Sequence, residues 1–120
     1  MGPEDLSDLL YGATNWKVKE SELLRMGEKI HNIEKAFNTL HAGFTRKEDF
    51  PPARLMESCV SQGPFEGEYL NKEKWNLMLD EYYDVHQWDR ETGWQTETCL
   101  DSLGLPPWVK ERLRGCNRIM

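Results

Sequence analysis

The chain has 120 residues, of which 15 are Lys or Arg and 21 are Asp or Glu, so its net charge is -6. This balance argues against binding to nucleic acid or to an anionic membrane surface, because both need a basic surface that neutralises phosphates. No apolar run approaches the length of a membrane-spanning helix, and the first residues are acidic where a secretory signal would be basic. The sequence therefore predicts one compact cytoplasmic domain, without nucleic acid or a membrane as a partner.

A short helix is predicted to begin at Pro3, because proline suits the first helical turn and the two acids after it complement the positive end of a helix. The residues from Gly12 to Asn15 are expected to end this helix. Trp16 and Val18 are then expected to pack the connection against the start of the next helix. The apolar face of the first helix consists of Leu6, Leu9, Leu10 and Ala13.

The stretch 20–40 predicts the central helix of the fold. Its apolar side chains recur at spacings of three and four, which places them on one stripe of an α-helix. They are Leu23, Met26, Ile30, Ile33, Phe37 and Leu40. The opposite face is expected to meet water and carries Glu22, Arg25, Glu28, Lys29, Glu34 and Lys35. Because so regular a stripe needs a partner, we expect it to face the core.

The character of the sequence changes over residues 41–70. Glycines and prolines interrupt every candidate helical period there, and only residues 52–58 could form a short helix. The segment is nevertheless too apolar for a free linker, since it contains Phe44, Phe50, Leu55, Met56, Val60, Phe65, Tyr69 and Leu70. We expect this irregular arm to lie on another surface, part of which belongs to a different domain.

A second long helix is predicted from the N-cap Asn71 to about Gln87, as the partner of the central helix. A broad aromatic stripe supports it, formed by Trp75, Met78, Leu79, Tyr82, Tyr83 and His86. The acidic residues Asp80, Glu81 and Asp84 could be a carboxylate cluster for a metal or for acid-base chemistry. Without a histidine, a third convergent ligand or a calcium loop beside them, a solvated acidic face is favoured.

The C-terminal third is predicted to start with a turn over residues 88–93, in which Gly93 can take a positive φ. Thr96 then caps a short helix that points Cys99, Leu100 and Leu103 inward and stops at Gly104.

The last residues, 106–120, predict one or two further helical turns that open at the pair Pro106 and Pro107. Their end is basic, with Arg112, Arg114 and Arg118. We expect this tail to be solvated or frayed, and it indicates no nucleic-acid site.

The cysteines and histidines give no recognisable site by their spacing. Cys59, Cys99 and Cys116 are odd in number and contain no C-x-x-C pair, so they are interpreted as reduced thiols. His31, His41 and His86 have no partner at i+4 and no carboxylate pair of metal-ligand type. A metal site would require these residues to converge in space, which their spacing does not indicate.

Several blocks of the sequence stand in an order that is specific to one family. They are ELLRMGEKIHNIEKAFN at 22–38, GFTRKED at 43–49, MLDEYY at 78–83 and LDSLGL at 100–105, with Pro52, Arg54, Gly63-Pro64, Gly67, Trp88-Asp89, Gly93 and Thr96 between them. Together they closely resemble the C-terminal domain of the tungsten-containing aldehyde ferredoxin oxidoreductases, whose members are several times longer. The resemblance covers residues 1–105 and leaves 106–120 as a divergent C-terminal tail.

For the complete enzyme, the resemblance implies oxidation of aldehydes to carboxylic acids, with electrons passing from a tungsten bis-pterin centre through a [4Fe-4S] cluster to ferredoxin. It also implies that the pterin-binding domain, the cluster cysteines and the active-site acid and histidine lie upstream of the matched segment. The string 100–105 imitates the family segment that supplies the fourth cluster cysteine, but Pro106 stands where that cysteine would be. We therefore assign no catalytic, cofactor-binding or metal residue in this chain.

The sequence thus predicts an all-α fold: two long packed helices, two or three short helices, and an irregular arm over 41–70. Two hypotheses on function follow. In the first, the chain is the structural C-terminal portion of an aldehyde ferredoxin oxidoreductase-like enzyme, inactive alone, with the upstream domains as partners and ferredoxin as partner of the complete enzyme. In the second, it is a helical protein-interaction module that has lost the enzymatic role.

Overall fold

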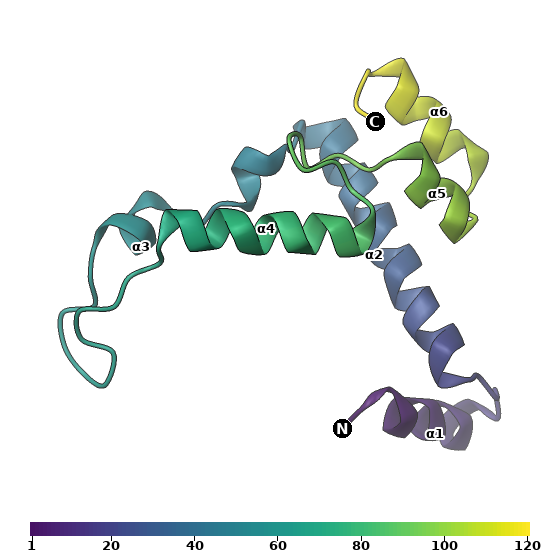
Figure 1. Ribbon diagram of the computed structural model, residues 1–120. Coiled ribbons are helices and arrows are strands. Elements are labelled where there is room, and N and C mark those ends of the chain that lie inside the picture. Colours follow the sequence, from purple (N-terminus) through teal and green to yellow (C-terminus); the bar gives the residue numbers. More distant parts are fainter.

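The computed structural model describes residues 1–120 and is built from helices without a sheet, which confirms the predicted all-α fold (Figure 1). The single β-like pairing is an isolated antiparallel bridge between Trp88 and Gln95. The elements are α1 (Pro3–Thr14), α2 (Glu20–Ala42), the 3-10 helix η1 (Arg46–Asp49), α3 (Ala53–Glu57), α4 (Lys72–His86), α5 (Glu97–Leu103) and α6 (Pro107–Gly115).

Helix ends lie where local capping chemistry places them. The side chain of Asn71 accepts a hydrogen bond from the Lys74 amide at the start of α4, and Thr96 caps α5 in the same way. Gly43 and Gly104 take left-handed conformations that end α2 and α5. The predicted caps of α4 and α5 are therefore confirmed.

The molecule is extended, so the prediction of a compact shape from its length is wrong. Its radius of gyration is 18.2 Å, whereas a compact domain of this length has about 14 Å. Figure 1 shows α2 as a diagonal spine, with α1 at one end and α5 and α6 at the other, while α4 and the arm extend away from it. Only 15 of the 120 residues are buried, so most side chains face solvent.

Two small clusters of buried side chains form the core, and Leu105 packs against both. The first joins α4, the turn after it and α5 through Leu79, Tyr83, Trp88, Cys99 and Leu103. The second joins α2, α5 and α6 through Ala36, Leu100, Val109 and Leu113. The core therefore lies around the C-terminal half of α2.

The central helix turns an unexpected face to this core. Its buried residues are Asn32, Lys35, Ala36 and Thr39. The predicted apolar stripe lies on another side of the helix, where Ile30, Ile33 and Phe37 are 59%, 45% and 61% exposed. The expectation that the stripe faces the core of this chain is wrong, as is the placement of Lys35 in water. The reason is physical: α5 and α6 cover the neighbouring polar face, and no element covers the middle of the stripe.

The two long helices meet only at one place. The helices in extensive contact with α2 are α1, α5 and α6, whereas α4 reaches α2 through side chains near its C-terminal end. There, His86 pairs with Glu28 and Tyr82 with His31. The rest of α4 continues away from α2 toward α3 (Figure 1). The two helices thus cross and do not pack along their length.

Residues 106–120 are an integral part of the fold, so the expectation of a frayed tail is wrong. Val109 and Leu113 of α6 are buried against α2 and α5. The Arg118 guanidinium donates to the carbonyl oxygens of Thr39 and Leu40 at 2.6 and 3.0 Å. Because the last carbonyls of a helix lack partners within it, this arginine completes the C-terminus of α2.

The arm contains the short helix predicted within residues 52–58, which is α3, and a 3-10 helix, η1, that was not predicted. Thr45 caps η1 by accepting a hydrogen bond from the Lys47 amide. Every residue from 57 to 70 is exposed. Within this part the chain folds back on itself, with Val60 and Glu68 joined by a 2.8 Å backbone hydrogen bond. The tip of the arm therefore covers no other part of the chain.

Candidate functional site

Arg46, at the start of η1, joins the arm to α4 and to the turn that follows α4. Its guanidinium donates to the Asp80 carboxylate at 2.6 Å and to both the carbonyl and the side-chain oxygen of Asn76 at 3.0 Å. It also donates to the Arg90 carbonyl at 2.6 Å. With an ion pair and three further acceptors, this arginine directs both terminal nitrogens to internal partners and has little capacity left for an external anion.

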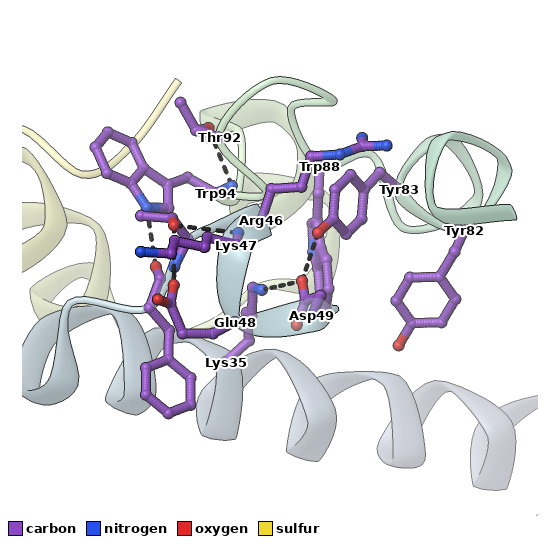
Figure 2. Close-up of polar contacts among 12 residues, drawn as sticks. Lys35, Arg46, Lys47, Glu48, Asp49, Tyr82, Tyr83, Trp88, Thr92 and Trp94 are labelled. Atoms are coloured by element: carbon purple, nitrogen blue, oxygen red, sulfur yellow. Dashed lines mark hydrogen bonds and ion pairs between the residues drawn. The ribbon is translucent and has the colours of Figure 1, made fainter. Parts of the chain in front are cut away.

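Asp49, at the end of η1, collects the charged and polar groups of the crossing region. Figure 2 shows Lys35 and Tyr83 pointing toward its carboxylate from α2 and α4. The Lys35 ammonium lies 3.4 Å from Oδ2, and the Tyr83 hydroxyl donates a short hydrogen bond to the same atom. The Trp75 indole donates to the Asp49 carbonyl at 3.1 Å. The carboxylate therefore balances a buried lysine, which is otherwise costly.

The electrostatics of this network keep Tyr83 neutral. Burial raises the pKa of Tyr83 well above its usual range, and the hydrogen bond and negative charge of Asp49 raise it further. Lys35 also lies 4.8 Å from the ring centroid of Trp88, within the range of a cation-π contact. Lys35, Asp49 and Tyr83 thus form a polar cluster that connects α2, η1 and α4, which we call the polar joint. Tyr83 acts in it as a hydrogen-bond donor and not as a base.

Gly93 closes the same joint from the turn after α4. Its φ is +71°, and a Cβ built there would lie 2.9 Å from the Tyr83 hydroxyl and 3.1 Å from the Arg46 amide. The predicted positive φ is confirmed. The close approach to Tyr83 is a second reason for glycine at this position, and only the tertiary structure reveals it.

Asn32 is the polar centre of the buried core. Its side-chain oxygen accepts hydrogen bonds from the Trp88 indole at 2.9 Å and from the Gln95 amide at 2.6 Å. The Cys99 thiol lies 3.4 Å from the same oxygen. The asparagine amide group in turn donates to the Glu28 carboxylate at 2.9 Å. These contacts attach the turn 88–95 and α5 to α2.

Two histidines that are far apart in the sequence meet where α4 crosses α2. The ring centroids of His31 and His86 are 5.3 Å apart, and both rings stack on Trp88. His86 Nδ1 lies 2.7 Å from a Glu28 oxygen, and His31 Nε2 lies 2.7 Å from the Tyr82 hydroxyl. Sequence reasoning missed this cluster, because no spacing rule connects residues 31 and 86.

The three cysteines do not assemble into a ligand set. Cys59 and Cys116 are exposed, on the arm and at the end of α6, while Cys99 is buried. Burial raises the pKa of Cys99 to about 11, so its thiol stays protonated near neutral pH. No group of three or more His, Cys, Asp or Glu side chains is arranged to hold a metal ion.

The acidic residues of α4 are not a free carboxylate cluster. Asp80 pairs with Arg46, and Asp84 pairs with Arg90. The hydrogen bond from Arg90 lowers the pKa of Asp84. Glu81 is exposed and has no ion-pair partner. Asp80 and Asp84 thus hold the arm and the following turn, while Asp84 and Glu81 are exposed, in agreement with the predicted solvated face.

The chain exposes more surface than a compact monomer of its mass. Its accessible area is 8783 Å², whereas a compact monomer of this mass exposes about 6,700 Å². Part of the excess surrounds a pocket of about 140 Å³ between α2 and α6. It is lined by Ile33, Ala36, Phe37, Leu40, His41, Trp108 and Val109. Because the polar networks around Arg46, Asp49 and Asn32 are satisfied largely by internal partners, the candidate functional feature of this molecule is its exposed apolar surface.

None of the helices has the length and apolar character needed to cross a membrane.

Comparison with known proteins gives one consistent result. The family model described as "Aldehyde ferredoxin oxidoreductase, domains 2 & 3" matches residues 1–105. The tungsten-containing aldehyde ferredoxin oxidoreductases of Pyrococcus abyssi and Pyrococcus horikoshii are each 36% identical over 110 residues. That of Thermococcus kodakarensis is 32% identical over 110 residues. Each match covers 91% of this chain but only 17% of the relative, so the chain spans about a sixth of the length of these relatives.

Proposed function

The chain belongs to the aldehyde ferredoxin oxidoreductase family and corresponds to the C-terminal part of its members; from this premise we propose that it is a structural portion of such an enzyme. It completes the enzyme by packing on the larger upstream portion and is not catalytic alone. The upstream domains, or a separately encoded equivalent, are its partners.

The excess of exposed surface is the observation that carries this proposal. The chain exposes 8783 Å², which is roughly 2,000 Å² more than a compact monomer of this size. Permanent interfaces bury about this much area on each partner, and they are more apolar than transient ones. The isolated chain thus has the surface expected of one part of an obligate assembly.

The chemistry of the complete enzyme comes to this chain only through its family. The names of the relatives refer to tungsten, an aldehyde and ferredoxin. We propose that the aldehyde is oxidised to a carboxylate on a tungsten bis-pterin centre and that a [4Fe-4S] cluster passes the electrons to ferredoxin. The ligands for both groups would belong to the upstream portion, because this chain offers no suitable donor set.

A reconstitution experiment tests the proposal. The Pyrococcus abyssi relative would be expressed without the 110 residues that match this chain, and this chain would be supplied as a separate polypeptide. We expect the two to copurify at a ratio of one to one and to reduce a viologen dye with an aldehyde as electron donor. The chain alone should give no dye reduction and no stoichiometric tungsten or iron.

Two outcomes would contradict the proposal. Failure of the wild-type chain to copurify with the truncated relative, when the relative's own C-terminal segment does so, would overturn the structural role. Aldehyde-dependent dye reduction by the chain alone would overturn its inactivity.

The comparisons do not favour the alternative of an interaction module that has lost its enzymatic role, since they match enzymes throughout. The cytoplasmic location stays a prediction.

A further inference from the structure

The apolar stripe of α2 was predicted to be buried, but its middle part is exposed. Ile30, Ile33 and Phe37 follow one another at helical spacing, and all three are exposed. Met26, one turn earlier, is partly covered, and Leu40, at the other end, packs against the second core cluster. The stripe is therefore closed at both ends by the chain itself and open in the middle.

The exposed middle part of the stripe has the surface shape of a helix-packing site. On one side of the ridge formed by Ile33 and Phe37 lies the 140 Å³ pocket whose opposite wall is Trp108 of α6. On the other side is a shallower hollow that Ile33 and Phe37 share with Glu34 and Asn38. A ridge with a hollow on each side matches the way in which helices interdigitate.

We propose that Ile30, Ile33 and Phe37 of α2, together with Trp108 of α6, form the seat for an apolar helix of the upstream polypeptide. One of its apolar side chains enters the pocket beside Trp108. This inference rests on the proposed function and adds the place of docking. It also assigns a binding role to α6, although residues 106–120 lie outside the family match.

The size of the surface decides between the possible occupants. The exposed part of the stripe spans only about 11 Å of helix, and a stable dimer buries roughly 800 Å² on each partner. A second copy held through this seat alone would bury too little. The upstream polypeptide makes up most of each relative, since the match covers 17% of it, and it can cover this seat together with other exposed faces.

The test uses charged variants in the reconstitution described above. Ile33→Glu and Phe37→Glu place a carboxylate on the seat, and Trp108→Ala removes the wall of the pocket. Leu24→Glu is the matched control, because Leu24 is on the same helix and is 56% exposed, but it lies about 120° to 180° around the helix from the stripe. Because all four residues are exposed in the isolated chain, its circular dichroism and melting temperature should be unchanged.

We expect Ile33→Glu and Phe37→Glu to weaken binding to the truncated relative at least about tenfold, and Trp108→Ala to weaken it several-fold. Leu24→Glu should bind within about twofold of the wild type. If the wild-type chain binds and the stripe variants bind equally well, the docking seat is wrong while the proposed function stands. If sedimentation shows a wild-type dimer that Phe37→Glu dissociates, the seat serves a second copy and the proposal is overturned. If the wild-type chain does not bind, both proposals fall.

Discussion

The C-terminal third of the molecule and the arm before α4 contain similar kinds of residue but use them in opposite ways. Residues 95–113 bury Cys99, Leu100, Leu103, Val109 and Leu113 against α2 and α4. Residues 57–70 contain Val60, Phe65, Tyr69 and Leu70 and bury none of them. The comparison teaches that apolar content alone does not locate the core of a chain. Four predictions test how far the two regions differ.

The largest effect should come from Leu113, which is completely buried between α6 and α2. Leu113→Ala removes Cγ and both Cδ carbons from a small core and should lower the free energy of unfolding by about 2–5 kcal/mol. Urea denaturation followed by circular dichroism measures it. Leu77→Ala on the exposed side of α4 is the control and should change stability by less than about 0.5 kcal/mol. Equal effects at the two sites would contradict the packing of α6.

The next effect concerns the glycine in the polar joint. Gly93→Ala puts a side chain at a φ of +71° and a Cβ 2.9 Å from the Tyr83 hydroxyl. We expect a loss of about 2 kcal/mol from backbone strain and displacement of Tyr83. Gly63→Ala in the arm is the matched control, since its φ is also positive but no atom lies near its Cβ. If both variants lose the same amount, strain alone explains the loss and the contact with Tyr83 contributes nothing.

Acid should destabilise the folded chain by a smaller amount. Burial acts to raise the pKa of Asp89, but hydrogen bonds from Thr92 and from the Glu91 amide outweigh it and lower the pKa overall. A hydrogen bond from Arg114 lowers the pKa of Glu97. Because unfolding returns these groups to ordinary values near 4, their stabilisation is complete above about pH 5 and is lost as pH falls through the lower folded values.

Denaturation midpoints measured from pH 8 to pH 3 would show this dependence as a plateau followed by a decline. Thr92→Val removes one of the hydrogen bonds to Asp89, the one from the hydroxyl at 2.6 Å. The decline below pH 5 should become shallower in this variant. An unchanged decline would show that Asp89 does not contribute to it.

The smallest effect is expected at the tip of the arm. Phe65 is exposed and touches no core cluster, so Phe65→Ser should change the stability of the isolated chain by less than about 0.5 kcal/mol. The same denaturation assay measures it. A loss above 1 kcal/mol would show that the arm packs on its own chain and would remove the contrast between the two regions.

Much of the secondary structure could be predicted from local sequence signals. The start of α4 at Asn71 and the limits of α5 at Thr96 and Gly104 follow from hydrogen bonds or φ values within a few residues. The short helix α3 was predicted on the same grounds, while η1 was missed. The candidate interface could be predicted only as a stripe, because the stripe was expected to face inward.

Sequence alone thus determined the helical class, most helix ends, the positive φ of Gly93 and the family, since these depend on neighbouring residues or on blocks read in order. Tertiary structure alone decided which face of α2 is buried, that the rings of His31 and His86 lie close together, and that residues 106–120 pack against the rest of the fold. These features depend on contacts between residues that are far apart in the chain, and no spacing rule encodes them. The exposed stripe adds a further reason, because periodicity shows that a helix face needs a partner but not which polypeptide supplies it.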